Sequence, residues 1–378
     1  MTPAHSFDFQ EKGFLITHLD ERLILHGMPW HVRLASSKGE RPQGMELEGD
    51  PLQEWKSLIE RSGRGAFSRR LEWAGLGDAG AQHLVELHPG DAAIPEWLTY
   101  LHEILDSTHK DGEPLDDTWF TSVDAQLIAM MRPGSAPIPY AHALWPLAEE
   151  ARKRVQEQVF AAQGDLSGVL PSAWNDLTMA LVVRLSTVLS RALQELRGST
   201  PYQSFCTSLV TDGMSTFLWE YPVSGRLISV LCQQWEVNAK TLIERVTADR
   251  VALEQEFDIG TATDLEAVEW ALSDPHRGGA TVAILRFTGE SRPVVYKPKD
   301  LHIERAYHEF TQGILSEFSD PLTTNKSANF GKPLRVHTVG HAYGYASFVT
   351  HAPCDEQDLP DFYRRAGRTM ALLHVLSA

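Results

Sequence analysis

Hydrophobic residues recur every three or four positions through most of the first 257 residues, which is the spacing of amphipathic helices. In "DPLQEWKSLIERS", Asp50 is placed to cap a helix and Pro51 to occupy its first turn. After a Pro-rich loop, a second amphipathic pattern predicts a helix from about Ala143. Longer patterns predict helices over Trp174–Leu196, Pro201–Glu220 and Val223–Phe257. We therefore expect a helical N-terminal region over residues 1–165 and a helical bundle over residues 166–257, with a linker near Ala162–Pro171.

The pattern changes near Ile259, where short runs rich in β-branched residues replace the helical spacing. "ATVAILRF" and "RPVVYK" predict a hairpin around "TGES", and "LRVHTVGHAYGYASFVTH" predicts a second strand pair with its turn near Tyr343–Gly344. The amphipathic segments "LHIERAYHEFTQGILSEF" and "DFYRRAGRTMALLHVLSA" predict one helix between the strand pairs and one after them. This order predicts an α+β protein, in which a third region over residues 258–378 holds a small antiparallel sheet and a helix.

Composition narrows the classes of partner. The net charge of −16 disfavours nucleic acid, because phosphate backbones bind basic surfaces. Residues 257–378 carry a net charge of −3 and the preceding 256 residues −13, so a phosphate-bearing ligand is expected in the C-terminal part. We expect no membrane span and no export signal, since no apolar run approaches the about 20 residues of a membrane helix. The three scattered cysteines fit reduced thiols, so a cytoplasmic protein is expected.

Two sequence motifs with known ligands, one for dinucleotides and one for zinc, occur in segments without the secondary structure that these motifs require. "GLGDAG" at Gly75–Gly80 matches a dinucleotide-binding pattern, but a charged, helix-like segment precedes it where that pattern requires a buried strand. His337 and His341 have the spacing of zinc ligands on a helix, but they lie in a segment rich in β-formers and glycine. We therefore expect a loop at the first, surface histidines at the second, and no metal ligand in this chain.

Lys297 ends the predicted strand "VVYK" and is followed by a helix that carries Glu304 and Glu309. Kinases place a lysine on a strand in this way, where it binds nucleotide phosphates and a helix glutamate orients it. Pro298 favours extended geometry at Lys297 and so supplies the step from strand to helix. A solvated lysine at the edge of a sheet would produce the same local pattern.

The turn "SDPHRGG" precedes this hairpin. Gly278 and Gly279 let backbone N–H groups approach an anion, and Arg277 adds positive charge. Asp274 and His276 add acid–base capacity that a plain phosphate loop does not need. A purely structural turn remains the alternative for this segment.

Together these segments resemble the N-terminal dehydratase domain of class II lanthipeptide synthetases of the LanM type. The resemblance is carried by "EYPVSGRLISVLCQQWEVNAKTLIERVTADRVAL", "SDPHRGG", "VVYKPKDL", "YGYASFVTHAPC" and "FYRRAGRTMALLHVLSA", in this order over about residues 201–378. The family more often has Arg where Ala280 stands in this chain.

The resemblance implies a lipid-kinase-like core wrapped in helices. It also implies ATP-dependent phosphorylation of Ser and Thr in a ribosomally made precursor peptide, followed by elimination of phosphate to dehydroalanine or dehydrobutyrine. Carried over by motif, Lys297 would bind the ATP phosphates, and Asp274 and His276 would serve the elimination. With the residue-level reasoning above, Glu304, Arg277, Gly278 and Gly279 are expected to contribute to ATP binding.

In the family, a catalytic Asp-x-His-x-x-Asn loop, a metal-binding Asp and a C-terminal zinc cyclase domain follow "LLHVLSA". The resemblance therefore implies a fragment that lacks the C-lobe and is inactive alone, with the Mg²⁺ ligands in the missing part. Two alternatives remain open at this stage, a non-catalytic module that binds the leader of a precursor peptide and another lipid or small-molecule kinase.

Overall fold

The computed structural model describes residues 23, 51–61, 63–73, 77–86, 94–108, 115, 117–131, 134–260, 263–289, 292–317, 335–350 and 355–377. Within them the chain divides into two compact units. Unit 1 comprises residues 1–157 and 178–237, and unit 2 comprises residues 158–177 and 238–378. The boundaries expected from the sequence at residues 165 and 257 stay a prediction.

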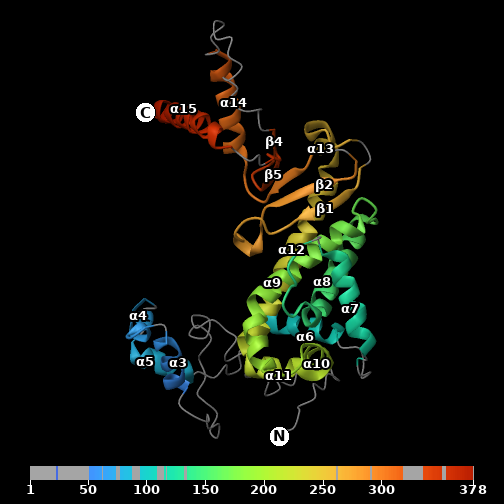
Figure 1. The fold of residues 1–378 in the computed structure, drawn as a ribbon, viewed down its shortest axis with the longest axis vertical. Coiled ribbons are helices and arrows are strands. Elements are labelled where there is room, and N and C mark those ends of the chain that lie inside the picture. The colour runs from blue at the N-terminus through green and yellow to red at the C-terminus, as the bar shows by residue number, and fades with distance from the viewer. Residues whose placement is uncertain are drawn as a thin grey trace. The chain divides into compact units, whose positions relative to one another are not determined.

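Unit 1 is helical over its described residues (Figure 1). Its helices are α3 (Pro51–Glu60), α4 (Ala66–Trp73), α5 (Asp78–Glu86), α6 (Glu96–Thr108), α7 (Asp117–Met130), most of α8 (Ala141–Gln163) and of α9 (Pro171–Arg197), α10 (Tyr202–Ser208), α11 (Met214–Glu220) and the start of α12 (Pro222–Ala248). Gly225 of α12 marks a close approach between helices, because an added Cβ would lie 3.0 Å from Leu101 and 3.3 Å from Leu218. The helical spacing of the sequence is therefore confirmed by a tightly packed core.

Several details of the helical prediction are corrected by the structure. The segment predicted as one helix over Pro201–Glu220 contains a π-helical turn, Leu209–Gly213, between α10 and α11. The helix predicted over Val223–Phe257 is broken at Asp249, where α12 ends and α13 (Arg250–Phe257) begins. "GLGDAG" begins just after helix α4, not after a strand, and its Gly77 immediately precedes α5, so the context required for dinucleotide binding is missing. Asp50, the expected N-cap, lies outside the described residues, but Pro51 does begin α3.

Unit 2 is built around a five-stranded antiparallel sheet. Its strands are β1 (Leu265–Glu269), β2 (Ala283–Phe287), β3 (Val294–Lys297), β4 (Val336–Val339) and β5 (Tyr343–Ser347), in the order β1-β2-β3-β5-β4. Helix α14 (His302–Glu317) connects β3 to the segment before β4 and contacts β4, and α15 (Leu359–Ser377) follows the sheet. The predicted α+β class is therefore confirmed, as is the position of Lys297 at the end of a strand.

Two features of the sheet differ from the sequence prediction. Strand β1 was not predicted, because Glu266, Ala267 and Glu269 are poor strand formers, and its pairing with β2 determines its conformation. The turn between β4 and β5 lies at residues 340–342, where Gly340 has a φ of +53°, and not at Tyr343–Gly344. Tyr343 and Gly344 instead begin β5.

One face of the sheet is buried against α13 and the end of α12. Residues that alternate along the strands share this face, and Tyr296 on β3 pairs with Tyr345 on β5. Arg245 of α12 donates a hydrogen bond of 2.6 Å to the Tyr296 hydroxyl, and Arg250 of α13 lies 5.1 Å from the Phe287 ring on β2. These contacts hold the strands that carry the candidate site.

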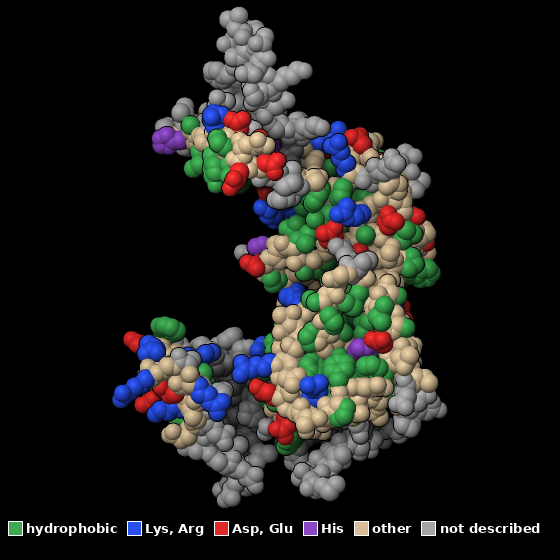
Figure 2. Space-filling view, in the orientation of Figure 1, with side chains coloured by type: hydrophobic (Ala, Val, Ile, Leu, Met, Phe, Trp, Pro, Cys, Tyr) green, Lys and Arg blue, Asp and Glu red, His purple; other side chains and the backbone are tan. Residues whose placement is uncertain are grey.

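The surface of both units mixes hydrophobic and charged side chains (Figure 2). On α14, the first three turns expose Ile303, Tyr307 and Phe310, which lie four and three residues apart. Among the described residues, no helix combines the length and the apolar character that a bilayer crossing requires.

Candidate functional site

The register of the sheet brings three connections to one edge. Ala283, the first residue of β2, pairs with Tyr296, and Lys297, the last residue of β3, pairs with Gly344 near the start of β5. The β1–β2 loop, the β3–α14 connection and the β4–β5 turn therefore leave the sheet on the same side. We refer to this side of the sheet, formed by residues 270–282, 297–304 and 340–342, as the loop edge.

Gly344 is required by close packing at this edge. A Cβ added at Gly344 would lie 2.4 Å from the backbone oxygen of His337 and 2.8 Å from Cδ1 of Leu301, both closer than real Cβ contacts allow. The glycine thus lets β5 and β4 approach Leu301, the fully buried residue that immediately precedes α14. It fixes the start of the helix that carries Glu304.

Lys297 and Glu304 are brought together. The Lys297 Nζ lies 4.0 Å from Glu304 Oε1, and both side chains are about one-third exposed or less. Lys299, which the sequence reasoning passed over, makes the shorter contact to the same oxygen, at 2.7 Å. Glu309, the other glutamate considered from the sequence, pairs with Arg305 at 2.8 Å, so the helix partner of Lys297 is Glu304.

The carboxylate of Glu304 is held in its charged form. Partial burial favours the neutral acid, but the hydrogen bond from Lys299 and the charges of Lys299 and Lys297 outweigh it and lower the pKa of Glu304 below its ordinary value. A charged Glu304 attracts the ammonium groups of both Lys299 and Lys297, at 2.7 Å and 4.0 Å. In kinases a helix glutamate likewise pairs with the strand lysine.

The β1–β2 loop is closed at its base by two hydroxyl side chains. Thr281, which is 3% exposed, donates to the backbone oxygen of Ser273 at 3.1 Å, and the Ser273 hydroxyl accepts from the Val282 N–H at 3.2 Å. The loop tip is a short 3₁₀ turn, Arg277–Gly279, in which Gly278 has a φ of +68°. Asn238 donates 2.7 Å to the Gly278 oxygen and so ties the tip to α12.

Asp274 and His276 lie on this loop with exposed side chains. Among the described residues, no hydrogen bond or ion pair joins either side chain to Lys297, so the structure places them at the same edge without direct contact. The backbone of Arg277 lies at the loop tip, and its side chain lies outside the described residues. The structure therefore brings the side chains of Lys297 and Glu304 close together, whereas the loop residues only lie on the same side of the sheet.

The loop edge fits a polyphosphate in its chemistry. Lys297 supplies a cation that is 27% exposed and oriented by a carboxylate, and the open space beside Gly278 leaves its backbone accessible to an anion. The order of a glycine-containing loop between the first two strands, a lysine on the third and a glutamate on the next helix is the order found around ATP phosphates in protein kinases.

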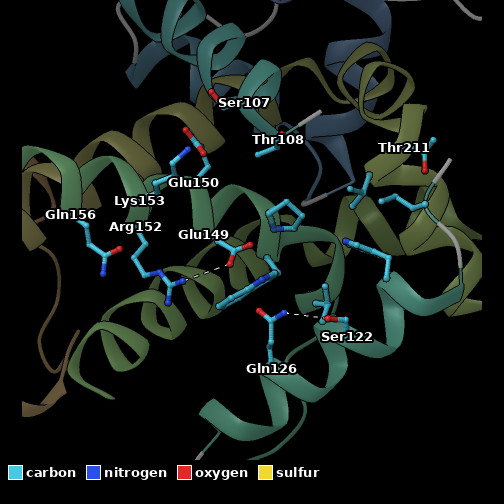
Figure 3. A pocket seen from close by; sticks show the side chains of 16 residues that line it. Ser107, Thr108, Ser122, Gln126, Glu149, Glu150, Arg152, Lys153, Gln156 and Thr211 are labelled. Atoms are coloured by element: carbon cyan, nitrogen blue, oxygen red, sulfur yellow. Dashed lines mark hydrogen bonds and ion pairs between the residues drawn. The ribbon is translucent and has the colours of Figure 1, made fainter. Parts of the chain in front are cut away.

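Unit 1 contains a separate cavity of about 830 Å³ (Figure 3). Figure 3 shows side chains of α7 and α8 around it, with Glu149 paired to Arg152 and Gln126 bonded to Ser122. Val210 and Thr211 of the π-helical turn also line it, and π turns often occur at functional sites. Trp145 also lines the cavity, and its buried indole N–H has no hydrogen-bond partner among the described residues.

Fold and site together define an α+β protein with a small antiparallel sheet whose loop edge gathers a lysine–glutamate pair and a glycine-containing loop. Residues 221–378 match a family model described as a domain of unknown function (DUF4135). The match begins at the residue before α12 and covers the whole sheet and α14 and α15. A search of curated proteins returned no match.

Proposed function

We propose that unit 2 is the nucleotide-binding lobe of a LanM-type peptide dehydratase, which phosphorylates Ser and Thr of a precursor peptide with ATP and then eliminates the phosphate. The observation that carries the proposal is the pairing of Lys297 at the end of β3 with Glu304 on α14, beside the β1–β2 loop. The matched domain is associated with lanthipeptide synthetases, which supports the same assignment.

In this proposal Lys297 binds the phosphates of ATP, and Glu304 keeps the ammonium in place. Gly278 and Arg277 form the part of the loop assigned to the phosphates, whereas Gly279, also expected from the sequence to bind an anion, is buried and donates its N–H to the His276 oxygen at 2.8 Å. ATP supplies the phosphoryl group, and Mg²⁺ neutralises charge on it during transfer. The proposal assigns no ligand of Mg²⁺ to the loop edge.

Asp274 and His276 are assigned to the elimination. In that step the α-proton of the phosphorylated residue moves to a base, the Cβ–O bond breaks, and inorganic phosphate leaves with the electron pair of that bond. An imidazole can accept or donate the proton near neutral pH, and a neighbouring carboxylate can orient it. The exposed positions of both side chains on the loop support access to a peptide.

The test is nucleotide binding by the protein, measured by titration calorimetry with ATP and Mg²⁺. Replacement of Lys297 by Ala removes one charge-assisted contact, for which about 1.5–3 kcal/mol is typical, so the affinity should fall by roughly tenfold or more. Lys299→Ala is the matched control, because it removes the closer partner of Glu304 but leaves Lys297 in place. It should change the affinity by less than about threefold.

Two results would refute the proposal: no ATP binding at millimolar concentration, or an equal loss in both lysine variants. Binding of ATP with loss only in Lys297→Ala, but with no phosphoryl transfer to a peptide, would favour a lipid or small-molecule kinase instead.

A second candidate function is supported by the cavity in unit 1. Its volume lies within the range of about 300–1,000 Å³ that is usual for ligand sites, and its lining combines the indole rings of two tryptophans with the charged side chains of Glu149, Arg152 and Lys153. Such a lining suits a peptide segment with mixed apolar and charged residues, as expected for a leader-binding module.

Ser122→Trp should fill the cavity and abolish binding of a fluorescein-labelled precursor peptide. Ala125→Trp, on an exposed position of the same helix that does not line the cavity, should leave the binding unchanged.

A further inference from the structure

Two histidines converge on one carboxylate at the loop edge. Asp300 lies in the β3–α14 connection, His302 begins α14, and His341 lies in the β4–β5 turn. The Nδ1 atom of His302 lies 2.6 Å from Asp300 Oδ1, and that of His341 lies 2.7 Å from Asp300 Oδ2. The two rings are 4.6 Å apart between centroids, and one potential ligand atom from each of the three residues lies within 4.8 Å of the others.

The sheet register explains why residues 41 positions apart meet here. Lys297 pairs with Gly344, so the chain that leaves β3 passes next to the chain that enters β5. Asp300 also accepts a hydrogen bond of 2.9 Å from the His302 backbone N–H, which fixes the carboxylate at the start of α14. Two of the three side chains therefore come from one rigid helix start and the third from a tight turn.

We propose that Asp300, His302 and His341 form a binding site for a divalent first-row transition metal ion such as Zn²⁺. Two imidazoles and one carboxylate are ligands that zinc commonly takes, and three protein ligands leave one position for water or another ligand. The site uses other residues than those assigned to the nucleotide, although Asp300 and His341 lie on the same loop edge.

Side-chain movements must bring the three ligand atoms closer together for an ion to bind. Ligand atoms at about 2.0–2.2 Å from a tetrahedral ion lie roughly 3.3 Å from one another, whereas one atom from each of the three residues lies within 4.8 Å of the others here, and the two histidines contact different oxygens of Asp300. Carboxylate oxygens only accept, so both Nδ1 atoms are protonated in the cluster described here. To bind the ion, each imidazole transfers this proton to Nε2 by way of water and presents the Nδ1 lone pair.

The test is Zn²⁺ binding to untagged protein by titration calorimetry, with Co²⁺ absorption in the visible range as a second readout of imidazole ligation. His341→Ala is the decisive variant, because this side chain is 84% exposed in a turn and its loss should leave the fold intact. It should lose one bound equivalent, or bind it at least about tenfold more weakly. Asp300→Asn keeps an oxygen for the His302 N–H but loses the charged ligand, and should behave in the same way.

His337→Ala is the matched control. His337 lies on the neighbouring strand β4 and makes one similar contact, 2.8 Å from Glu256, without a second histidine. Its Zn²⁺ binding should equal that of the unsubstituted protein. In hydrogen-exchange mass spectrometry, Zn²⁺ should slow exchange in peptides covering residues 298–304 and 338–343 of the unsubstituted protein.

Equal Zn²⁺ binding by the unsubstituted protein and His341→Ala would overturn the proposal. An equal loss in His337→Ala, or Zn²⁺ protection that spares both segments, would overturn it as well.

Discussion

Asp249→Ala is expected to loosen the sheet that carries the candidate site. Asp249 lies between α12 and α13, and its Oδ2 accepts hydrogen bonds from the Tyr343 hydroxyl at 2.8 Å and the Tyr345 hydroxyl at 2.9 Å. Both tyrosines are on β5, and the Arg245 guanidinium lies 4.0 Å above the Tyr343 ring. A single carboxylate therefore links the start of β5 to the helices behind it.

The magnitude follows from the two bonds that are lost. A hydrogen bond to a charged group contributes about 1.5–3 kcal/mol, and a buried donor left without a partner adds a desolvation cost. The Tyr345 hydroxyl is fully buried, so the loss of its hydrogen bond should cost a free energy near the upper value. The Tyr343 side chain is half-buried, so its hydroxyl can form a hydrogen bond with water instead. We expect a loss of about 3–4 kcal/mol for Asp249→Ala, and about 1–2 kcal/mol for either Tyr343→Phe or Tyr345→Phe.

The assay is native-state hydrogen exchange in peptides that cover β3 and β5, because the two units need not unfold together. A loss of about 3–4 kcal/mol corresponds to roughly 100- to 1,000-fold faster exchange at amides whose exchange reports the equilibrium of local opening. Exchange in α6 and α8 of unit 1 serves as the internal control and should not change. Acceleration of β5 by less than about fivefold would refute the reasoning, because the carboxylate would then not hold the strand.

Further predictions concern the same sheet and its loops. Gly344→Ala should destabilise unit 2 by at least about 2 kcal/mol in urea unfolding, since the added Cβ meets backbone at 2.4 Å; a change below 0.5 kcal/mol would contradict this. Burial, followed by the Asp249 charge, raises the pKa of Tyr345 above its ordinary value of 10.0, so its contribution to stability is full below pH 10 and is lost as the pH rises through the folded value. Tyr345→Phe should flatten that fall between pH 9 and 11, and an unchanged fall would contradict it. If the proposed function holds, a precursor peptide incubated with ATP and the Lys297→Ala protein should stay unmodified, whereas the His276→Ala protein should accumulate phosphopeptide, as measured by mass spectrometry. Unmodified peptide from both variants would place His276 in phosphate binding or folding.

The sequence alone predicted the helical character of the first 257 residues and most of the sheet, but not the π turn at Leu209–Gly213 or the break at Asp249. Helical spacing predicted α9 within three residues at each end, because its apolar face packs in a core. Lys297 was placed correctly at a strand end because β-branched residues precede it and Pro298 follows. Strand β1 was missed because its glutamates and alanine carry no strand preference, and only pairing with β2 gives it that conformation.

Contacts at the loop edge were less predictable because they depend on register. The glycine of "HAYGYAS" was interpreted as a turn residue, whereas Gly344 is needed for close packing and Gly340 makes the turn. Neither Lys299 beside Glu304 nor His341 beside Asp300 follows from spacing along the chain. These side-chain contacts can be predicted only when the register between β3 and β5 is known.

The measurement that tests the central claim most directly is the location of ATP on the protein. Hydrogen-exchange mass spectrometry with and without saturating ATP and Mg²⁺ should show slower exchange in residues 273–282 and 294–300, with Lys297→Ala losing that protection. Adenosine, which lacks phosphates, should protect these segments less than ATP does. ATP-dependent protection confined to the cavity of unit 1, or an unchanged pattern in Lys297→Ala, would contradict the assignment of the loop edge as a phosphate site.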